Sequence, residues 1–211
     1  MFGVAEGSTD PSSEGAASGI AISCLREAAQ RHEKSSAALL DRAVHESDAR
    51  IGARVVKSQD VPQDVTHLSA CIIDNALECT ILDTGEGNAY LIDRDSIQVP
   101  REHTLSRHPE GPGFPDGGHG SEKKRGGMIS HTLGEPRILM KTDFSAVNLA
   151  DRFLLLSSGG LHDYIKKDRI AEIVLKNGEN VEMSCELLVQ EALSAGSDRT
   201  ITIVLVHGHL H

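Results

Sequence analysis

The sequence predicts an α+β protein in which helices pack on antiparallel β-sheet. Two segments near its start, residues 13–31 and 35–56, carry apolar residues at helical spacing. Short extended segments follow over residues 68–99, and further helical segments at 161–194 precede a last strand at 200–206. Strands and helices do not alternate regularly, so a parallel sheet built from βαβ units is not expected.

The first elements follow from composition and spacing. Residues 2–5 are a short apolar segment that predicts a strand, and the Gly, Asp and Pro of residues 6–11 indicate a turn after it. The helix predicted at 13–31 has an apolar face made of Ala17, Ile20, Ala21, Cys24, Leu25 and Ala28. The helix predicted at 35–56 has its apolar face at Leu40, Val44, Ile51 and Val55.

The middle of the chain changes to extended spacing. Residues 68–73 and 77–82 predict a hairpin, and residues 88–93 and 96–99 predict two more strands of the same meander. Residues 106–127 combine many Pro and Gly with almost no apolar side chains. Such a segment buries too little surface to offset its ordering entropy, so we expect a mobile loop there.

The last third returns to regular elements. Strands are predicted at 138–142 and 152–157, the second after a polar turn at 148–152. Helices are predicted at 161–166, 168–176 and 181–194, and the Ile/Thr/Val-rich residues 200–206 predict the closing strand. With 211 residues and no internal repeat, we expect residues 1–211 to form a single domain.

Composition excludes several classes of function. The net charge of −10 argues against a nucleic-acid partner, because binding to phosphates needs a basic surface. No apolar stretch reaches the roughly 20 residues that span a bilayer, and the first residues do not have the pattern of a signal peptide. We therefore expect a cytoplasmic protein without a membrane partner.

The cysteines and the terminal histidines do not indicate a metal or redox motif. The four cysteines form no CxxC pair. Cys71 and Cys79 could face each other across a hairpin, but we expect reduced thiols in a cytosolic core. His207, His209 and His211 would share one side of a continued strand, and we expect an exposed tail there.

One strand end has the form of a functional loop. Apolar residues 154–156 lead into Ser157, Ser158, Gly159 and Gly160, and a helix start follows. A loop at a strand tip normally carries a reactive or ligating side chain. Here glycine stands at the centre of the loop, so the position expected to hold chemistry carries no side chain.

Several segments together resemble the metal-dependent protein serine/threonine phosphatases of the PPM (type 2C) family in their bacterial form. The family motifs FAVADGMGG, GDSRAY, RDHS, RALG, GDRLLLCSDGLTD and GSRDNITVVVV are matched, in order, at residues 2–10, 85–90, 101–104, 131–134, 150–163 and 196–204. An AS-IA pattern that opens the family's first helix is matched at residues 17–21. The matches span nearly the whole chain.

This resemblance implies an α-β-β-α sandwich: two antiparallel sheets packed face to face, with helix pairs outside. It also implies chemistry. In such enzymes aspartates hold two Mg or Mn ions, and a water between the ions attacks the phosphorus of phosphoserine. Carboxylates suit these hard cations, and the paired charges lower the pKa of the bound water.

The residues that the resemblance places at the metals depart from the family pattern. Glu6 stands for the bridging aspartate, while Gly7, whose carbonyl the family also uses, is kept. Gly159 and Arg199 replace two further aspartates, so both are lost metal positions. Asp198 lies one residue early, where its side chain would point the other way. The family's N-terminal strands, with their RxxNED segment, are expected to be missing.

The acid and the base at neighbouring family positions suggest that a guanidinium replaces a metal. We expect Arg199 to pair with Glu6 and with Asp10, or else to be a surface arginine in a relaxed loop. His103 and Asp163 are expected neighbours of the site, with strand pairing as the alternative role for His103. Residual metal binding, if any, is expected at Glu6, Gly7 and Asp198.

The expected function is that of a pseudophosphatase, a binding or regulatory module in Ser/Thr phosphorylation signalling with no tightly bound metal. Its expected partner is a protein, either a phosphoprotein or a Ser/Thr kinase. The alternative is an active Mn- or Mg-dependent phosphatase that uses Glu6, Asp198, Asp10 or Asp163. A third hypothesis is a fragment whose missing strands come from upstream sequence or from a second copy in a homodimer.

Overall fold

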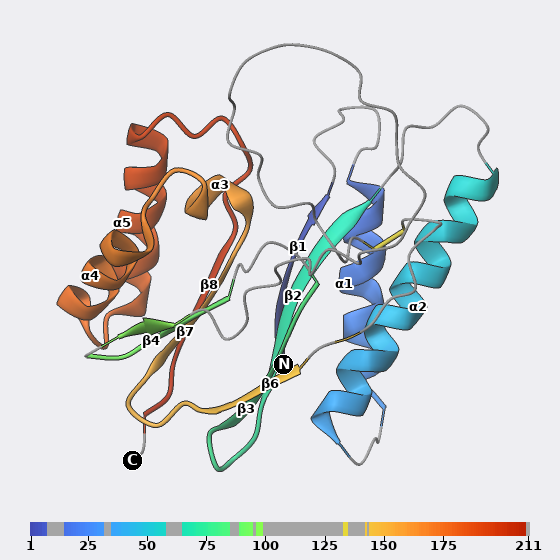
Figure 1. Cartoon of the computed structure of the whole chain (residues 1–211), viewed down its shortest axis with the longest axis horizontal. Coiled ribbons are helices and arrows are strands. Elements are labelled where there is room, and N and C mark those ends of the chain that lie inside the picture. Colours follow the sequence, from blue (N-terminus) through green and yellow to red (C-terminus); the bar gives the residue numbers. More distant parts are fainter. Residues whose placement is uncertain are drawn as a thin grey trace, which may run out of the picture.

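A computed structural model describes residues 1–7, 15–31, 35–57, 65–84, 89–94, 96–98, 133–134, 142 and 144–209. These residues form two β-sheets in the middle of the molecule with helices on both outer sides (Figure 1). The predicted α-β-β-α sandwich of two antiparallel sheets is confirmed.

The first sheet is antiparallel and has the order β1-β2-β3-β6. Its strands are β1 (Phe2–Gly7), β2 (Thr66–Ile73), β3 (Glu78–Asp83) and β6 (Phe144–Asn148). Its outer face is covered by α1 (Ala16–Ala29) and α2 (Ser36–Lys57), which lie side by side in Figure 1. The helix pair therefore packs on the sheet as the apolar spacing predicts.

The second sheet is also antiparallel and has the order β5-β4-β7-β8. Its strands are β4 (Ala89–Ile92), β5 (Ile97–Gln98), β7 (Phe153–Ser157) and β8 (Ile203–His207). Its outer face carries α3 (Gly159–His162), α4 (Lys167–Asn177) and α5 (Val181–Ser194).

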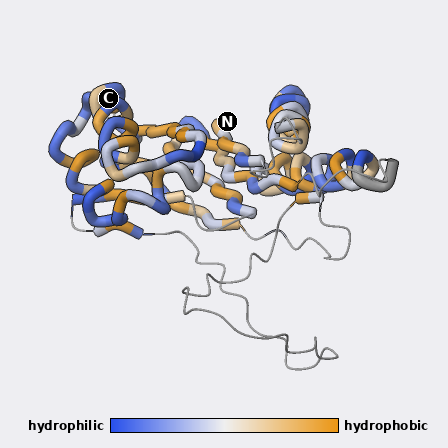
Figure 2. The backbone as a smooth tube through the Cα atoms, turned by 90° about the horizontal axis from the view of Figure 1, so that it is seen from above, coloured by the Kyte–Doolittle hydropathy of each residue, from blue (hydrophilic) through white to orange (hydrophobic). Residues whose placement is uncertain are grey.

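Alternation along the strands sends side chains into separate layers of the core. On β7, Phe153 and Leu155 pack against α4 and α5, while Leu154 and Leu156 lie in the cluster between the sheets. In Figure 2, which colours the backbone by hydropathy, hydrophobic and hydrophilic residues both occur along the helices. Each fully buried leucine stabilises the fold by about 1.5–3 kcal/mol, so both faces of β7 anchor the loop that follows it.

The structure corrects one prediction about the meander. β4 and β5 do not continue the first sheet; they pair with β7 in the second one. Spacing within a strand predicts a buried face but not the sheet to which that face belongs. The sequence did not predict β6. The mobile loop predicted at 106–127 lies outside the described residues, and so does the strand predicted at 138–142 except for residue 142.

Cys71 and Cys79 share the inner face of the first sheet as diagonal neighbours, because Cys71 lies opposite Ile81 and Cys79 opposite Ile73. Both are buried free thiols. A hydrogen bond between them is the main cause that lowers the pKa of Cys71 and raises that of Cys79. Diagonal pairs are typically ~7–8 Å apart, beyond the usual Cα separation of a disulfide, so a disulfide between these two residues would require the backbone to move.

This geometry makes a prediction for thiol reactivity. In the folded protein we expect Ellman's reagent to leave Cys71 and Cys79 unmodified, because neither thiol is exposed. Cys185, which is only partly buried, should react slowly, since burial raises the pKa of its thiol. All four thiols should react in denaturant. Rapid modification of Cys71 in the folded protein would contradict this arrangement.

In the part of the chain that the structure describes, no helix combines the length and the apolar character that crossing a membrane requires.

Candidate functional site

The site forms where elements of both sheets end close together. Glu6 lies near the end of β1 in the first sheet, and Gly159 follows β7 in the second. Arg199 belongs to the segment that leads into β8, and Asp163 follows the short helix α3. Because β7 and β8 are antiparallel neighbours, the end of β7 and the start of β8 lie at the same end of their sheet.

The guanidinium of Arg199 lies between two carboxylates. Its Nη2 donates to Oε1 of Glu6 at 2.6 Å, and its Nη1 makes an ion pair with Asp163. The other oxygen of Glu6, Oε2, accepts a hydrogen bond of 2.6 Å from the backbone N–H of Gly159. The side chain of Glu6 is only 15% exposed. Its negative charge is therefore neutralised within the protein, and the predicted pairing of Arg199 with Glu6 is confirmed.

The absence of a side chain at residue 159 makes this arrangement possible. A Cβ added to Gly159 would lie 2.7 Å from both Nη1 and Nη2 of Arg199 and 2.8 Å from its Cζ. Real Cβ atoms do not approach heavy atoms so closely, so the guanidinium occupies the space that any side chain at 159 would need.

Hydroxyl groups fix the surrounding loop. Ser158 donates from Oγ to the carbonyl of Thr200 at 2.8 Å and accepts at 2.9 Å from the backbone N–H of Thr202. Ser197 donates to the carbonyl of Gly160 at 2.8 Å. These bonds tie the loop after β7 to the entry of β8, which holds Gly159 and Arg199 in register.

Asp198 points to a different partner from Arg199. Its Oδ1 accepts a hydrogen bond of 2.7 Å from the hydroxyl of Tyr164. This bond lowers the pKa of Asp198 and raises the pKa of Tyr164. The hydrogen bond that the structure shows for the Asp198 carboxylate thus lies with Tyr164 and not with the Glu6–Arg199 pair.

A cavity of about 400 Å³ opens at these residues. Its walls are Ala5, Glu6, Gly7, Gly15, Ser18, Ser158, Asp198, Arg199, Thr200 and Thr202. The structure thus brings together five predicted residues: Glu6, Gly7, Gly159, Asp198 and Arg199. Asp163, also predicted, contacts Arg199. Asp10 and His103 lie outside the described residues.

Two neighbours of the site escaped the sequence analysis. Tyr164 bonds Asp198, as described, and His67 lies opposite Glu6 in the register of β1 and β2. Opposite residues of an antiparallel pair share one face of the sheet, so the pairing of residues 2–7 with 66–71 would have identified His67. Its Nδ1 is buried and has no hydrogen-bond partner among the described residues.

The described residues do not fit a divalent cation. Mg²⁺ requires near-octahedral oxygen coordination, whereas both oxygens of Glu6 already accept hydrogen bonds from protein donors. The positive charge of Arg199 separates Glu6 from Asp163 and would repel a metal ion. Within the described ranges, no three His, Cys, Asp or Glu side chains are grouped so that they could hold a metal.

No protein-family model and no curated protein matches the chain. Solved structures do resemble it. The serine/threonine phosphatase PstP/Ppp of Mycobacterium tuberculosis is 20% identical with a TM-score of 0.76, and the match covers 96% of this chain and 86% of that one. The catalytic domain of PstP with two manganese ions gives a TM-score of 0.75 at 21% identity, covering 96% and 85%.

Two further phosphatases show the same likeness. The S. agalactiae serine/threonine phosphatase has a TM-score of 0.75 at 16% identity, and the match covers 97% of this chain and 86% of that one. PppA of Pseudomonas aeruginosa, described as a regulatory component of T6SS, has 0.72 at 16%, with 97% and 84% coverage. This chain has the fold of the PPM-type serine/threonine phosphatases. The structural similarity establishes this fold, whereas identities of 16–21% say nothing about the chemistry of the site.

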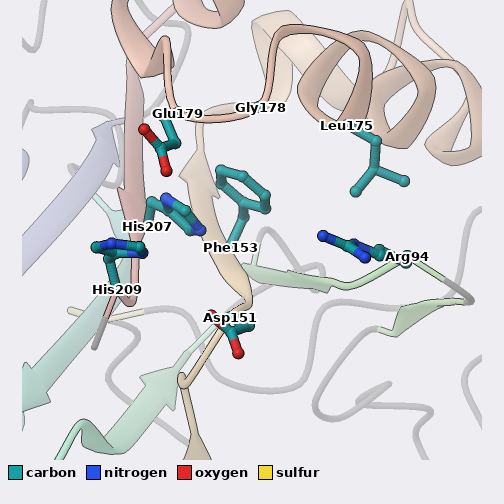
Figure 3. Close-up of a pocket in the computed structure, with 8 residues that line it drawn as sticks. All are labelled: Arg94, Asp151, Phe153, Leu175, Gly178, Glu179, His207 and His209. Atoms are coloured by element: carbon teal, nitrogen blue, oxygen red, sulfur yellow. The ribbon is translucent and has the colours of Figure 1, made fainter. Parts of the chain in front are cut away.

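A second cavity of about 510 Å³ lies at the other end of the second sheet (Figure 3). Phe153 and His207, partners across β7 and β8, stack there with ring centres 4.1 Å apart. The charged groups around them, Arg94, Asp151 and Glu179, are exposed on its rim. This cavity contains none of the residues that the sequence analysis assigned to the site.

Proposed function

We propose that the protein is a pseudophosphatase: a PPM-type phosphatase fold without metal-dependent catalysis, which acts as a binding or regulatory module in Ser/Thr phosphorylation signalling. One observation carries this proposal. The guanidinium of Arg199 stands between the carboxylates of Glu6 and Asp163, against the bare α-carbon of Gly159.

The chemistry of hydrolysis supports the proposal. One PstP structure contains two manganese ions, and a bound metal ion lowers the pKa of its water, so that a hydroxide nucleophile forms more easily. A guanidinium has no coordination position for water and does not generate hydroxide. Without such a nucleophile, the cleft of this chain is not equipped to attack a phosphate ester.

The proposed partner is a protein, either a phosphoprotein or a Ser/Thr kinase. The centre of the site offers a phosphate group few donors, because Nη1 and Nη2 of Arg199 and the N–H of Gly159 already bind carboxylates. Nε of Arg199 has no partner among the described residues, but it is buried. We therefore propose that the partner is recognised by the surface around the cleft and not through a phosphate held by Arg199.

The alternative function is an active Mn- or Mg-dependent serine/threonine phosphatase with an altered metal site. It is favoured by Glu6 and Asp198, two carboxylates that line one cavity. Asp163 would add a third carboxylate only after leaving Arg199.

Calorimetry and hydrolysis assays separate the two functions. We expect no heat of binding when Mn²⁺ or Mg²⁺ is added, and no metal-dependent turnover of para-nitrophenyl phosphate or of a phosphoserine peptide. The PstP catalytic domain, measured in parallel, is the positive control. Turnover that disappears with a chelator and returns with Mn²⁺ would establish the alternative.

A further inference from the structure

We infer that Arg199 and Gly159 form a single device: the guanidinium is a permanent cation that joins the two sheets, and the missing side chain at 159 provides its space. This inference rests on the same contacts as the proposed function. It goes further, because it states what holds the cleft together and predicts that this does not depend on a metal.

The contacts cross from one layer of the sandwich to the other. Glu6 belongs to β1 in the first sheet, whereas Gly159 and Arg199 belong to the loop and strand entry of the second. Both oxygens of Glu6 accept from the opposite layer, one from the Gly159 N–H and one from Nη2 of Arg199. The carboxylate of Glu6 is thus clamped between two donors of the second sheet.

The contacts of Glu6 with the second sheet depend on the guanidinium of Arg199, because the Glu6 carboxylate is charged and mostly buried. Glu6 is mostly buried, and a buried carboxylate needs a compensating positive charge or several donors. Without Arg199, Glu6 would retain the single N–H of Gly159 among the bonds that the structure shows for its carboxylate. Asp163 would lose its ion pair with Nη1 at the same time.

Space makes the two positions depend on each other. A Cβ added at residue 159 would lie 2.7 Å from both Nη1 and Nη2 of Arg199. An alanine at this position would therefore displace the guanidinium from Glu6. A residue at 199 that lacks the guanidinium would leave this space open, so the same alanine would be tolerated. The loss of stability caused by a side chain at residue 159 should therefore depend on which residue occupies position 199.

A double-mutant cycle with Gly159→Ala and Arg199→Met tests this dependence. Methionine keeps an apolar stem at 199 and removes the charge and the planar group. We expect each single variant to lower the folded-to-unfolded ratio in urea. We also expect Gly159→Ala to lower this ratio by a factor about tenfold smaller in the Arg199→Met background than in the unmodified protein. A coupling of this size is typical of residues in contact.

A matched control uses Arg169, which also bridges two carboxylates, Glu172 and Glu191, on exposed helix surface. Arg169→Met should leave stability unchanged within error, because exposed ion pairs contribute little, and it should show no coupling to Gly159→Ala. Additive effects of Gly159→Ala and Arg199→Met would overturn the inference.

Hydrogen exchange provides a second measurement if Gly159→Ala does not fold. In the unmodified protein the Gly159 amide should exchange slowly, because it donates to Glu6. In Arg199→Met it should exchange at least about tenfold faster, while amides of α1 keep their rates. An unchanged Gly159 rate would overturn the inference.

Melting curves with Mn²⁺ and with a chelator complete the test and separate this inference from the proposed function. The unmodified protein should melt at the same temperature in both. A melting temperature that rises with Mn²⁺ would count against the proposed function, because a ligand of the folded state stabilises it. Additive effects in the mutant cycle, with no response to Mn²⁺, would overturn the inference alone. Metal-dependent turnover together with intact coupling would overturn the proposed function alone.

Discussion

Replacing Gly160 by alanine should destabilise the protein by about 3 kcal/mol, a large loss for a single methyl group. A Cβ at this position would lie 2.4 Å from the carbonyl oxygen of Thr200 and 2.9 Å from its carbonyl carbon. Both are backbone atoms and cannot rotate away as the end of a side chain can. The loop after β7 and the entry to β8 would have to separate, and with them the contacts of Ser158 and Ser197.

Gly19 offers a matched control for the same substitution. It is exposed on α1, and a Cβ there would meet nothing within 4 Å. Gly19→Ala should stabilise the helix by about 0.5–1 kcal/mol, because alanine restricts the unfolded chain more and favours the helix. Urea unfolding followed by circular dichroism measures both variants. If Gly160→Ala were as stable as Gly19→Ala, the close approach of the two segments would be wrong.

The sequence predicted most of the helices and strands because their apolar residues have clear spacing. α2 lies at Ser36–Lys57 where a helix was predicted at 35–56, and α5 at Val181–Ser194 where one was predicted at 181–194. The spacing of apolar residues does not indicate to which sheet a strand belongs. β4, for example, is buried on both faces and would fit either sheet. β6 escaped because its five residues are only half-buried or exposed at a sheet edge.

The site was predicted in part, and by a different route. Gly159 and Arg199 were found by comparing motifs with a resembling family, since no local rule assigns a partner to a residue forty positions away. The partner of the second guanidinium nitrogen is Asp163; the predicted Asp10 lies outside the described residues. Asp163 was recognised only as a neighbour, because the direction of a side chain after a one-turn helix depends on loop dihedral angles that composition does not determine.

The double variant Gly159→Asp with Arg199→Asp should gain a metal site that the unmodified protein lacks. It places carboxylates at 159 and 199, where the resembling family carries aspartates, and removes the positive charge between Glu6 and Asp163. Without metal, the added negative charge should repel Glu6 and lower the melting temperature. With Mn²⁺ the loss should be reversed, since a ligand at 1,000 times its dissociation constant stabilises by about 4.1 kcal/mol.

The single variants show why both changes are needed. In Gly159→Asp alone, the new side chain would meet the guanidinium of Arg199, with its Cβ 2.7 Å from Nη1. In Arg199→Asp alone, the position at 159 would still supply no oxygen. Melting with Mn²⁺ and with Ca²⁺, whose larger radius suits a different cage, should therefore show a Mn²⁺-dependent rise in the double variant and none in either single variant. A double variant that ignores Mn²⁺ would mean that positions 159 and 199 do not face a common ion, and that the guanidinium of Arg199 does not stand in a metal's place.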